Sequence, residues 1–104
     1  MEIEAETLAD WRGQGLPHVL VDVREPWETE ICSIGDSRNI PLAELAESLD
    51  MIPSEGPVVV VCHHGVRSME ATAWLRSAGF AGAVNLRGGI EMWARRVDPT
   101  MRRY

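Results

Sequence analysis

At 104 residues, with 45% hydrophobic and 25% charged side chains, the chain has the size and composition of one globular domain over residues 1–104. Its net charge of -6 disfavours a general nucleic-acid binder, because such a protein needs surplus positive charge to displace counterions from the phosphate backbone. No apolar run is long enough to cross a bilayer, and two cysteines are too few for a disulfide scaffold. We therefore expect a cytoplasmic protein with free thiols. We expect no membrane partner and no nucleic-acid partner.

The first half of the chain predicts helices and strands in alternation. Residues 7–12 predict a helix that the following glycines end. Residues 19–23 form a nearly unbroken aliphatic run, which is typical of a strand buried on both faces of a parallel sheet. Residues 38–40 predict a short edge strand before a proline, and apolar residues at helical spacing follow over residues 42–49.

The second half continues the alternation. Residues 58–61 are a second buried strand, and residues 66–78 predict a helix with Gly79 placed to cap its end. Residues 83–86 predict a last short strand, and an apolar stripe over residues 90–97 predicts a closing helix. This order favours an α/β fold with a parallel sheet and right-handed crossovers.

The main functional candidate is the loop that joins the strand over residues 58–61 to the next helix. Open α/β sheets bind ligands at the carboxyl ends of their strands, and Cys62 lies at this end. The loop continues through His63, His64, Gly65, Val66, Arg67 and Ser68. Backbone N–H groups of a tight loop, the start of a helix and a nearby arginine all favour thiolate over thiol, and a protonated histidine would add to this. Cys62 is therefore a candidate nucleophile. The same N–H groups and positive charge would also stabilise an anionic persulfide on it.

The alternative is that Cys62 belongs only to the core. Free cysteine is among the most buried residue types, and a cysteine that ends an aliphatic strand commonly packs inside. A core cysteine has no need of a glycine, an arginine and a serine at loop spacing after it. The loop pattern therefore favours the chemical interpretation.

Four segments spread over nearly the whole chain form an ordered set of motifs. They are VDVREPWE at residues 21–28, RNIPL at 38–42, CHHGVRS at 62–68, and LRGGI at 86–90 with Trp93 after it. In this order they resemble the motifs of the rhodanese domain family, in which a cysteine heads the active-site loop.

The resemblance implies a single α/β domain with a central, mostly parallel five-stranded sheet flanked by helices on both faces. It also implies a thiosulfate sulfurtransferase, which moves sulfane sulfur from thiosulfate or a persulfide donor to cyanide, a thiol or a protein. The sulfur would pass through a persulfide on Cys62. Residues 63–68 would bind the substrate, with Arg67 as the cationic wall. We expect no cofactor, and no standard zinc spacing predicts a metal site.

Three other functions stay open from the sequence. The chain could be a protein-partnered sulfur carrier in cofactor or tRNA sulfur delivery, because residues 93–104 resemble the tail of rhodanese domains attached to sulfur-carrier activating enzymes. It could be a cysteine-dependent phosphatase or arsenate reductase, but those loops have an arginine where this chain has Ser68. It could be a binding module without catalysis, although such modules usually lose the cysteine.

Other notable residues lie outside the loop, and a structural role is the favoured interpretation for each of them. Cys32, where the family usually has Gly-His-Ile, is interpreted as a small packing residue, with a resolving thiol or second sulfur carrier as the alternative. Asp22 and Arg24 are expected to form a partly buried ion pair that braces the sheet, because buried charges are rarely left unpaired. Trp11 and Trp74 lie on predicted helix faces and are assigned to the core.

Overall fold

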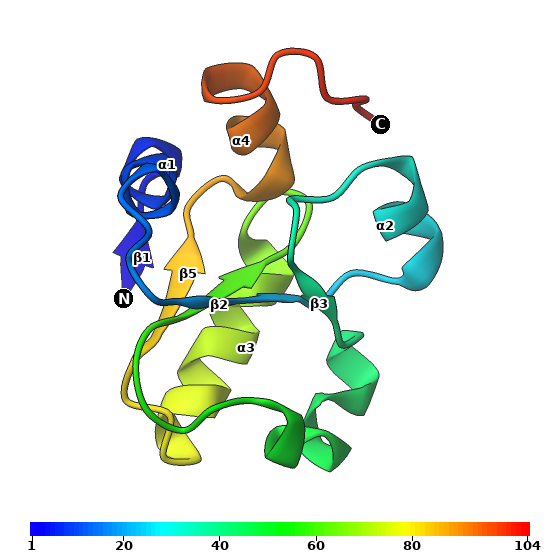
Figure 1. The fold of residues 1–104 in the computed structure, drawn as a ribbon. Helices are drawn as coiled ribbons and strands as arrows, with labels where there is room; N and C mark the ends of the chain where they lie inside the picture. Colours follow the sequence, from blue (N-terminus) through cyan, green and yellow to red (C-terminus); the bar gives the residue numbers. More distant parts are fainter.

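The computed structural model describes residues 1–104 and has a central sheet of five parallel strands (Figure 1). The strands are β1 (Glu2–Ile3), β2 (Val19–Asp22), β3 (Arg38–Asn39), β4 (Val58–Val61) and β5 (Ala83–Leu86). Their order in the sheet is β1-β5-β4-β2-β3, and each neighbouring pair is parallel. The predicted sheet is therefore confirmed, with β3 at one edge as expected.

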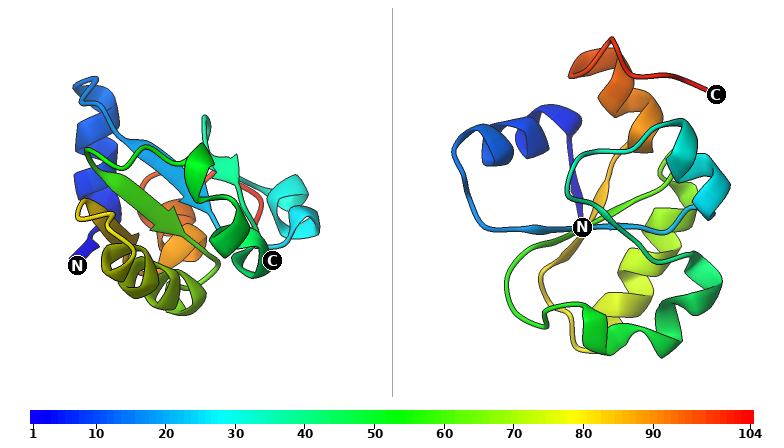
Figure 2. Two further views of the ribbon diagram at one scale, coloured as in Figure 1. Left: turned by 90° about the horizontal axis from the view of Figure 1, so that it is seen from below. Right: turned by 45° about the vertical axis from the view of Figure 1, so that its right-hand side comes forward.

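Helices cover both faces of the sheet (Figure 2). They are α1 (Ala5–Gly13), α2 (Pro26–Ile31), α3 (Val66–Ser77) and α4 (Gly89–Arg96), with the 3-10 helices η1 (Leu42–Glu47) and η2 (Leu49–Met51). Apolar residues of α1 and α4 pack on one face. Those of α3 and η1 pack on the other, together with Leu49 of η2 and Ile52 after it. None of these helices has the length and apolar character needed to span a membrane.

The strand β4 lies in the middle of the sheet and contributes to both halves of the core. Val58 and Val60 pack in the cluster beneath α3, while Val59 and Val61 pack in the cluster beneath α1 and α4. All four side chains are at most 1% exposed. Burial on both faces explains why every position of this strand is aliphatic.

Several elements differ from the sequence prediction. The strand β1 and the helix α2 were not predicted, since two and six residues are too short to show a clear hydrophobic period. The apolar residues over 42–49 form 3-10 turns rather than one regular helix. Trp74 was wrongly assigned to the core: it is 40% exposed, on the outer side of α3.

Candidate active site

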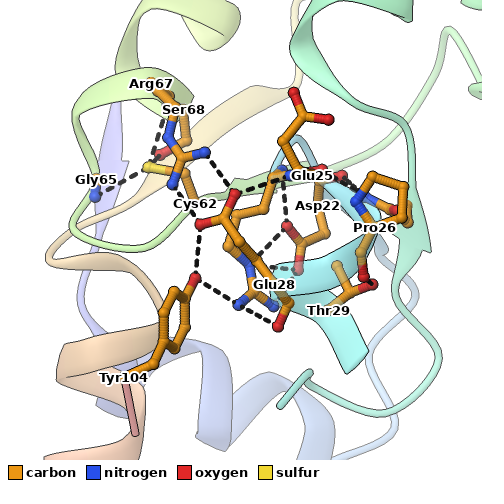
Figure 3. Close-up of polar contacts among 12 residues, drawn as sticks. Asp22, Glu25, Pro26, Glu28, Thr29, Cys62, Gly65, Arg67, Ser68 and Tyr104 are labelled. Atoms are coloured by element: carbon orange, nitrogen blue, oxygen red, sulfur yellow. Dashed lines mark hydrogen bonds and ion pairs between the residues drawn. The ribbon is translucent and has the colours of Figure 1, made fainter. Parts of the chain in front are cut away.

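Cys62 lies where β4 ends and the loop to α3 begins, and backbone amides converge on its sulfur (Figure 3). The residue is only 1% exposed, so its side chain is also part of the core. The N–H groups of Gly65 and Ser68 donate hydrogen bonds to Cys62 Sγ over 3.1 and 3.3 Å. Ser68 lies in the first turn of α3, whose positive dipole end therefore faces the sulfur. The arrangement stabilises negative charge at Sγ.

Gly65 gives the loop its shape. It precedes the first residue of α3 in the left-handed region, with φ of 94°, which favours glycine. A Cβ atom here would lie 3.0 Å from the backbone nitrogen of Gly88. The glycine thus lets the chain turn sharply enough for its own N–H to reach the Cys62 sulfur.

The hydroxyl of Ser68 lies between the sulfur and Asn85. Ser68 Oγ is 3.2 Å from Cys62 Sγ and 2.5 Å from Asn85 Oδ1. Its single hydrogen can be donated to only one of them, so this hydrogen can move toward the sulfur when charge develops there. Asn85 is held in place because its Nδ2 donates to Glu2 Oε2 and to the carbonyl oxygen of Gly65. Sequence reasoning missed Asn85, although one polar residue within the strand segment AVNL was a usable signal.

The start of α4 is hydrogen-bonded to the same loop. The N–H groups of Ile90 and Glu91 donate to the carbonyl oxygens of Cys62 and His63 over 2.8 and 3.1 Å. A Cβ atom on Gly89 would lie 2.4 Å from the carbonyl oxygen of Cys62. This close approach gives a physical reason for the second glycine of the Gly-Gly motif.

Arg67 does not point freely into the site, because it is paired with a carboxylate from α2. Its Nη1 and Nη2 donate to Glu28 Oε2 and Oε1, both over 2.8 Å. The Glu28 side chain is 5% exposed and the Arg67 side chain 38%. The guanidinium of Arg67 lowers the pKa of Glu28 to about 2, with further help from the hydroxyl of Tyr104, so this carboxylate is ionised at neutral pH. The sequence contained Glu28 in its first motif but gave no sign of this contact.

Tyr104 closes the side of the site next to His63. The two rings stack with centroids 3.9 Å apart, and His63 stacks in turn on His64 at the same distance. The tyrosine hydroxyl accepts from Arg24 Nη1 over 2.9 Å and donates to Glu28 Oε1 over 2.8 Å. Burial raises the pKa of Tyr104 to about 12, so the hydroxyl keeps the hydrogen that it donates. Sequence reasoning did not assign Tyr104 to the site.

His63 is less able to carry charge than the sequence suggested. Burial, and then the neighbouring His64, lower the pKa of His63 below its usual range. Its Nε2 is buried and has no hydrogen-bond partner. Protonation of this ring is therefore disfavoured, and its visible contacts are the stacking ones with His64 and Tyr104. Among the described residues 1–104, no three His, Cys, Asp or Glu side chains gather in a way that could hold a metal ion.

The predicted ion pair of Asp22 and Arg24 is present and fully buried. Arg24 Nη2 lies 2.7 Å from Asp22 Oδ2, and the two side chains are at most 1% exposed. The same nitrogen donates to the carbonyl oxygen of Cys32 over 2.7 Å, while Arg24 Nη1 lies 3.9 Å from Cys32 Sγ. Through Tyr104, this pair is also linked to Glu28 and so to the active-site loop.

Comparisons with known proteins agree on one family. The family model described as a rhodanese-like domain matches residues 4–96. A protein of Allochromatium vinosum described as a sulfurtransferase is 36% identical over 94 residues, which cover 90% of this chain and 88% of that protein. The probable adenylyltransferase/sulfurtransferase MoeZ of Mycobacterium tuberculosis is 40% identical over 104 residues, which cover 98% of this chain but only 26% of that protein. This chain thus spans about a quarter of the length of MoeZ.

The fold has matching solved structures. The crystal structure of a rhodanese-related protein from Thermoplasma volcanium superposes with a TM-score of 0.81 at 34% sequence identity. The superposition covers 92% of each chain. The similarity therefore extends over nearly the whole molecule.

Proposed function

Because the chain belongs to the rhodanese-like domain family, whose members include sulfurtransferases, we propose that it transfers sulfane sulfur through a persulfide on Cys62. The observation that carries this proposal is the convergence of two backbone N–H groups and the Ser68 hydroxyl on one sulfur atom. A cysteine that only packs in a core has no use for two backbone donors and a nearby hydroxyl at its sulfur. Donors in this geometry favour the anionic state that attack on sulfur requires.

The proposed reaction is a double displacement. The Cys62 thiolate attacks the outer sulfur of thiosulfate, the S–S bond of the donor breaks, and sulfite leaves with the bonding electron pair. The enzyme then carries Cys62–S–S⁻, whose outer sulfur is taken by cyanide as thiocyanate, and the thiolate returns. A persulfide donor and a thiol or protein acceptor would follow the same two steps.

Each loop residue has a proposed role in this sequence. The N–H groups of Gly65 and Ser68 hold the charge on the sulfur, and the Ser68 hydroxyl can join them. The loop is completed by His63, His64 and Val66, which are proposed to contact the substrate. Its positively charged side chain is Arg67. Since both cysteines of the chain are free, we place the reaction in a reducing, cytoplasmic setting.

A second candidate function is that of a sulfur carrier for a protein partner. It is supported by the similarity over 98% of this chain to part of MoeZ, a probable adenylyltransferase/sulfurtransferase. The chemistry at Cys62 would be the same, and only the donor and acceptor would differ. A phosphatase is not favoured, because Ser68 Oγ contacts the sulfur from the position where such an enzyme would have its arginine.

The proposal is tested by turnover. We expect the protein to form thiocyanate from thiosulfate and cyanide, and Cys62→Ser to abolish this activity without loss of the folded state. Circular dichroism and thermal unfolding of the variant provide the control. Hydrolysis of an aryl phosphate without any thiocyanate formation would overturn the proposal in favour of a phosphatase.

A further inference from the structure

Arg67 is the only arginine of the active-site loop, and its charge is already balanced by Glu28. Two parallel hydrogen bonds of 2.8 Å join the guanidinium to the carboxylate, which is the strongest arrangement for this pair. In Figure 3 the side chain of Arg67 lies over the loop beside Cys62 and reaches across to Glu28. An incoming anion therefore meets an ion pair at this point and not a free cation.

Glu28 is held firmly in this role. Besides Arg67, the backbone N–H of Glu25 donates to Oε2 over 2.9 Å and the hydroxyl of Tyr104 donates to Oε1 over 2.8 Å. The Glu28 side chain is only 5% exposed, and each of its hydrogen-bond partners is a donor. These contacts keep the carboxylate ionised and paired with Arg67. Its negative charge is a fixed part of the site.

The other groups that contact this ion pair or Tyr104 do not replace the charge of Arg67. The buried guanidinium of Arg24 is matched by Asp22, and the stacked ring of His63 has its Nε2 buried away from solvent. Charges farther away are screened within about 8 Å at physiological ionic strength, so the local balance decides how an anion is received. The donors at Sγ can stabilise one negative charge there, while both guanidinium groups beside the loop, Arg24 and Arg67, are already matched by carboxylates.

We propose that Glu28 is a specificity-determining, positioning residue, which keeps Arg67 paired and so makes a dianionic sulfur donor poorer than a monoanionic donor of the same chemistry. This inference rests on the proposed sulfur transfer at Cys62. The substrate class that the site favours is thus a sulfane-sulfur donor with a single negative charge.

Two simple donors deliver the same outer sulfur atom but differ in charge. Thiosulfate carries two negative charges and releases sulfite, whereas methanethiosulfonate carries one and releases methanesulfinate. In both, the Cys62 thiolate attacks the outer sulfur, the S–S bond breaks and the leaving group takes the electron pair, so Cys62–S–S⁻ forms in either reaction. The ratio of the two second-order rate constants, thiosulfate over methanethiosulfonate, also contains the difference between the two leaving groups, which is the same in every variant. A change in this ratio from one variant to another therefore reports the effect of the extra charge.

The experiment measures this ratio from the rate of persulfide formation in a single turnover. Glu28→Gln leaves Arg67 unmatched, and we expect the ratio to rise about tenfold, mainly through a lower KM for thiosulfate. Arg67→Gln leaves the carboxylate unmatched, and the ratio should fall by about the same factor. The double variant restores a neutral pair, and its ratio should return to within about twofold of the wild-type value.

Glu30→Gln is the matched control, because Glu30 is an exposed glutamate on the same helix α2. It should leave the ratio unchanged. Should Glu28→Gln fail to fold, Arg67→Gln still decides the matter, since an unchanged ratio in that variant overturns the proposal. The proposal is also overturned if the ratios of the four proteins do not follow the predicted order. In that order Glu28→Gln has the highest ratio, the wild type and the double variant agree within about twofold, and Arg67→Gln has the lowest.

The outcome also separates this inference from the one on which it rests. If the wild-type protein forms no persulfide on Cys62 with either donor, the proposed function itself fails. If the persulfide forms but the ratio does not follow the predicted order, only the role of Glu28 is wrong.

Discussion

At the scale of single residues, Cys62 combines a position in the core with a sulfur atom on which backbone donors converge. The side chain is 1% exposed and belongs to the apolar cluster beneath α3, as the structural alternative expected. Yet its sulfur accepts hydrogen bonds from Gly65 and Ser68, as the chemical interpretation expected. Burial strengthens these contacts, because a hydrogen bond to a charged atom is worth more where water is excluded.

The ion pair of Glu28 and Arg67 makes a prediction for acid stability. The pKa of Glu28 is lowered from 4.5 to about 2 in the folded protein, so the stabilisation is fully present above about pH 4.5 and is lost as the pH falls toward 2. Since Arg67 is partly exposed, we expect a contribution of roughly 1 to 2 kcal/mol to the free energy of unfolding. Urea unfolding of the wild type and of Glu28→Gln between neutral pH and pH 2.5 measures it.

The difference between these two proteins should shrink over that acid range. Glu30→Gln again serves as the control, because its carboxylate is exposed and makes no ion pair with the loop. Curves for wild type and Glu28→Gln that stay parallel down to the lowest pH would contradict the assignment of this pH dependence to Glu28.

At the scale of elements, the strands and the loop after β4 were largely predictable from the sequence. An aliphatic run such as Val58–Val61 identifies a strand buried on both faces, and the glycine and serine that follow predict a tight turn into a helix. The helix α2 was not predicted, although it positions Glu28. This helix begins with a capping box between Glu25 and Glu28 and has Pro26 in its first turn. The capping box is only a local signal, because a helix of six residues is too short to show a hydrophobic period.

The junction of β5 and α4 gives a prediction at this scale. Gly89 has φ of 61°, and a Cβ atom there would lie 2.4 Å from the carbonyl oxygen of Cys62. We expect Gly89→Ala to destabilise the protein by roughly 3 kcal/mol, from backbone strain together with the forced separation of α4 from the loop. Persulfide formation on Cys62 should slow as well.

Gly15→Ala is a suitable control. Gly15 has a similar φ of 68°, but a Cβ atom on it would meet nothing within 4 Å. This variant should therefore lose only the strain component, about 1 kcal/mol, and keep its activity. Urea unfolding gives both values, and equal destabilisation by the two substitutions would mean that the approach of α4 to the loop is not the cause.

At the scale of the whole molecule, the site depends on contacts between segments far apart in the chain. Tyr104 is 80 residues from Arg24 and 76 from Glu28, yet its hydroxyl joins them. No spacing rule within a single sequence predicts such contacts, because they follow from how the segment after α4 reaches α2, where Tyr104 contacts Trp27 and Glu28. This is why the sequence predicted a candidate site at Cys62 and its loop but did not assign Glu28, Asn85 and Tyr104 to it.

Tyr104→Phe tests this long-range bridge. The substitution keeps the ring that stacks on His63 but removes an acceptor for the buried Arg24 and a donor for Glu28. We expect a loss of about 1 to 2 kcal/mol in the free energy of unfolding. Thr100→Val, which removes an exposed hydroxyl on the same segment, should change stability by less than about 0.5 kcal/mol. If the two variants are equally stable in urea, the bridge does not hold the molecule together.

The central claim is that sulfur is carried on Cys62, and the mass of the intact protein tests it most directly. After incubation with excess thiosulfate, the wild type and Cys32→Ser should each gain the mass of a single sulfur atom, which cyanide removes. Cys62→Ser should gain none. A sulfur that is still added to Cys62→Ser, or that is absent only from Cys32→Ser, would contradict the account.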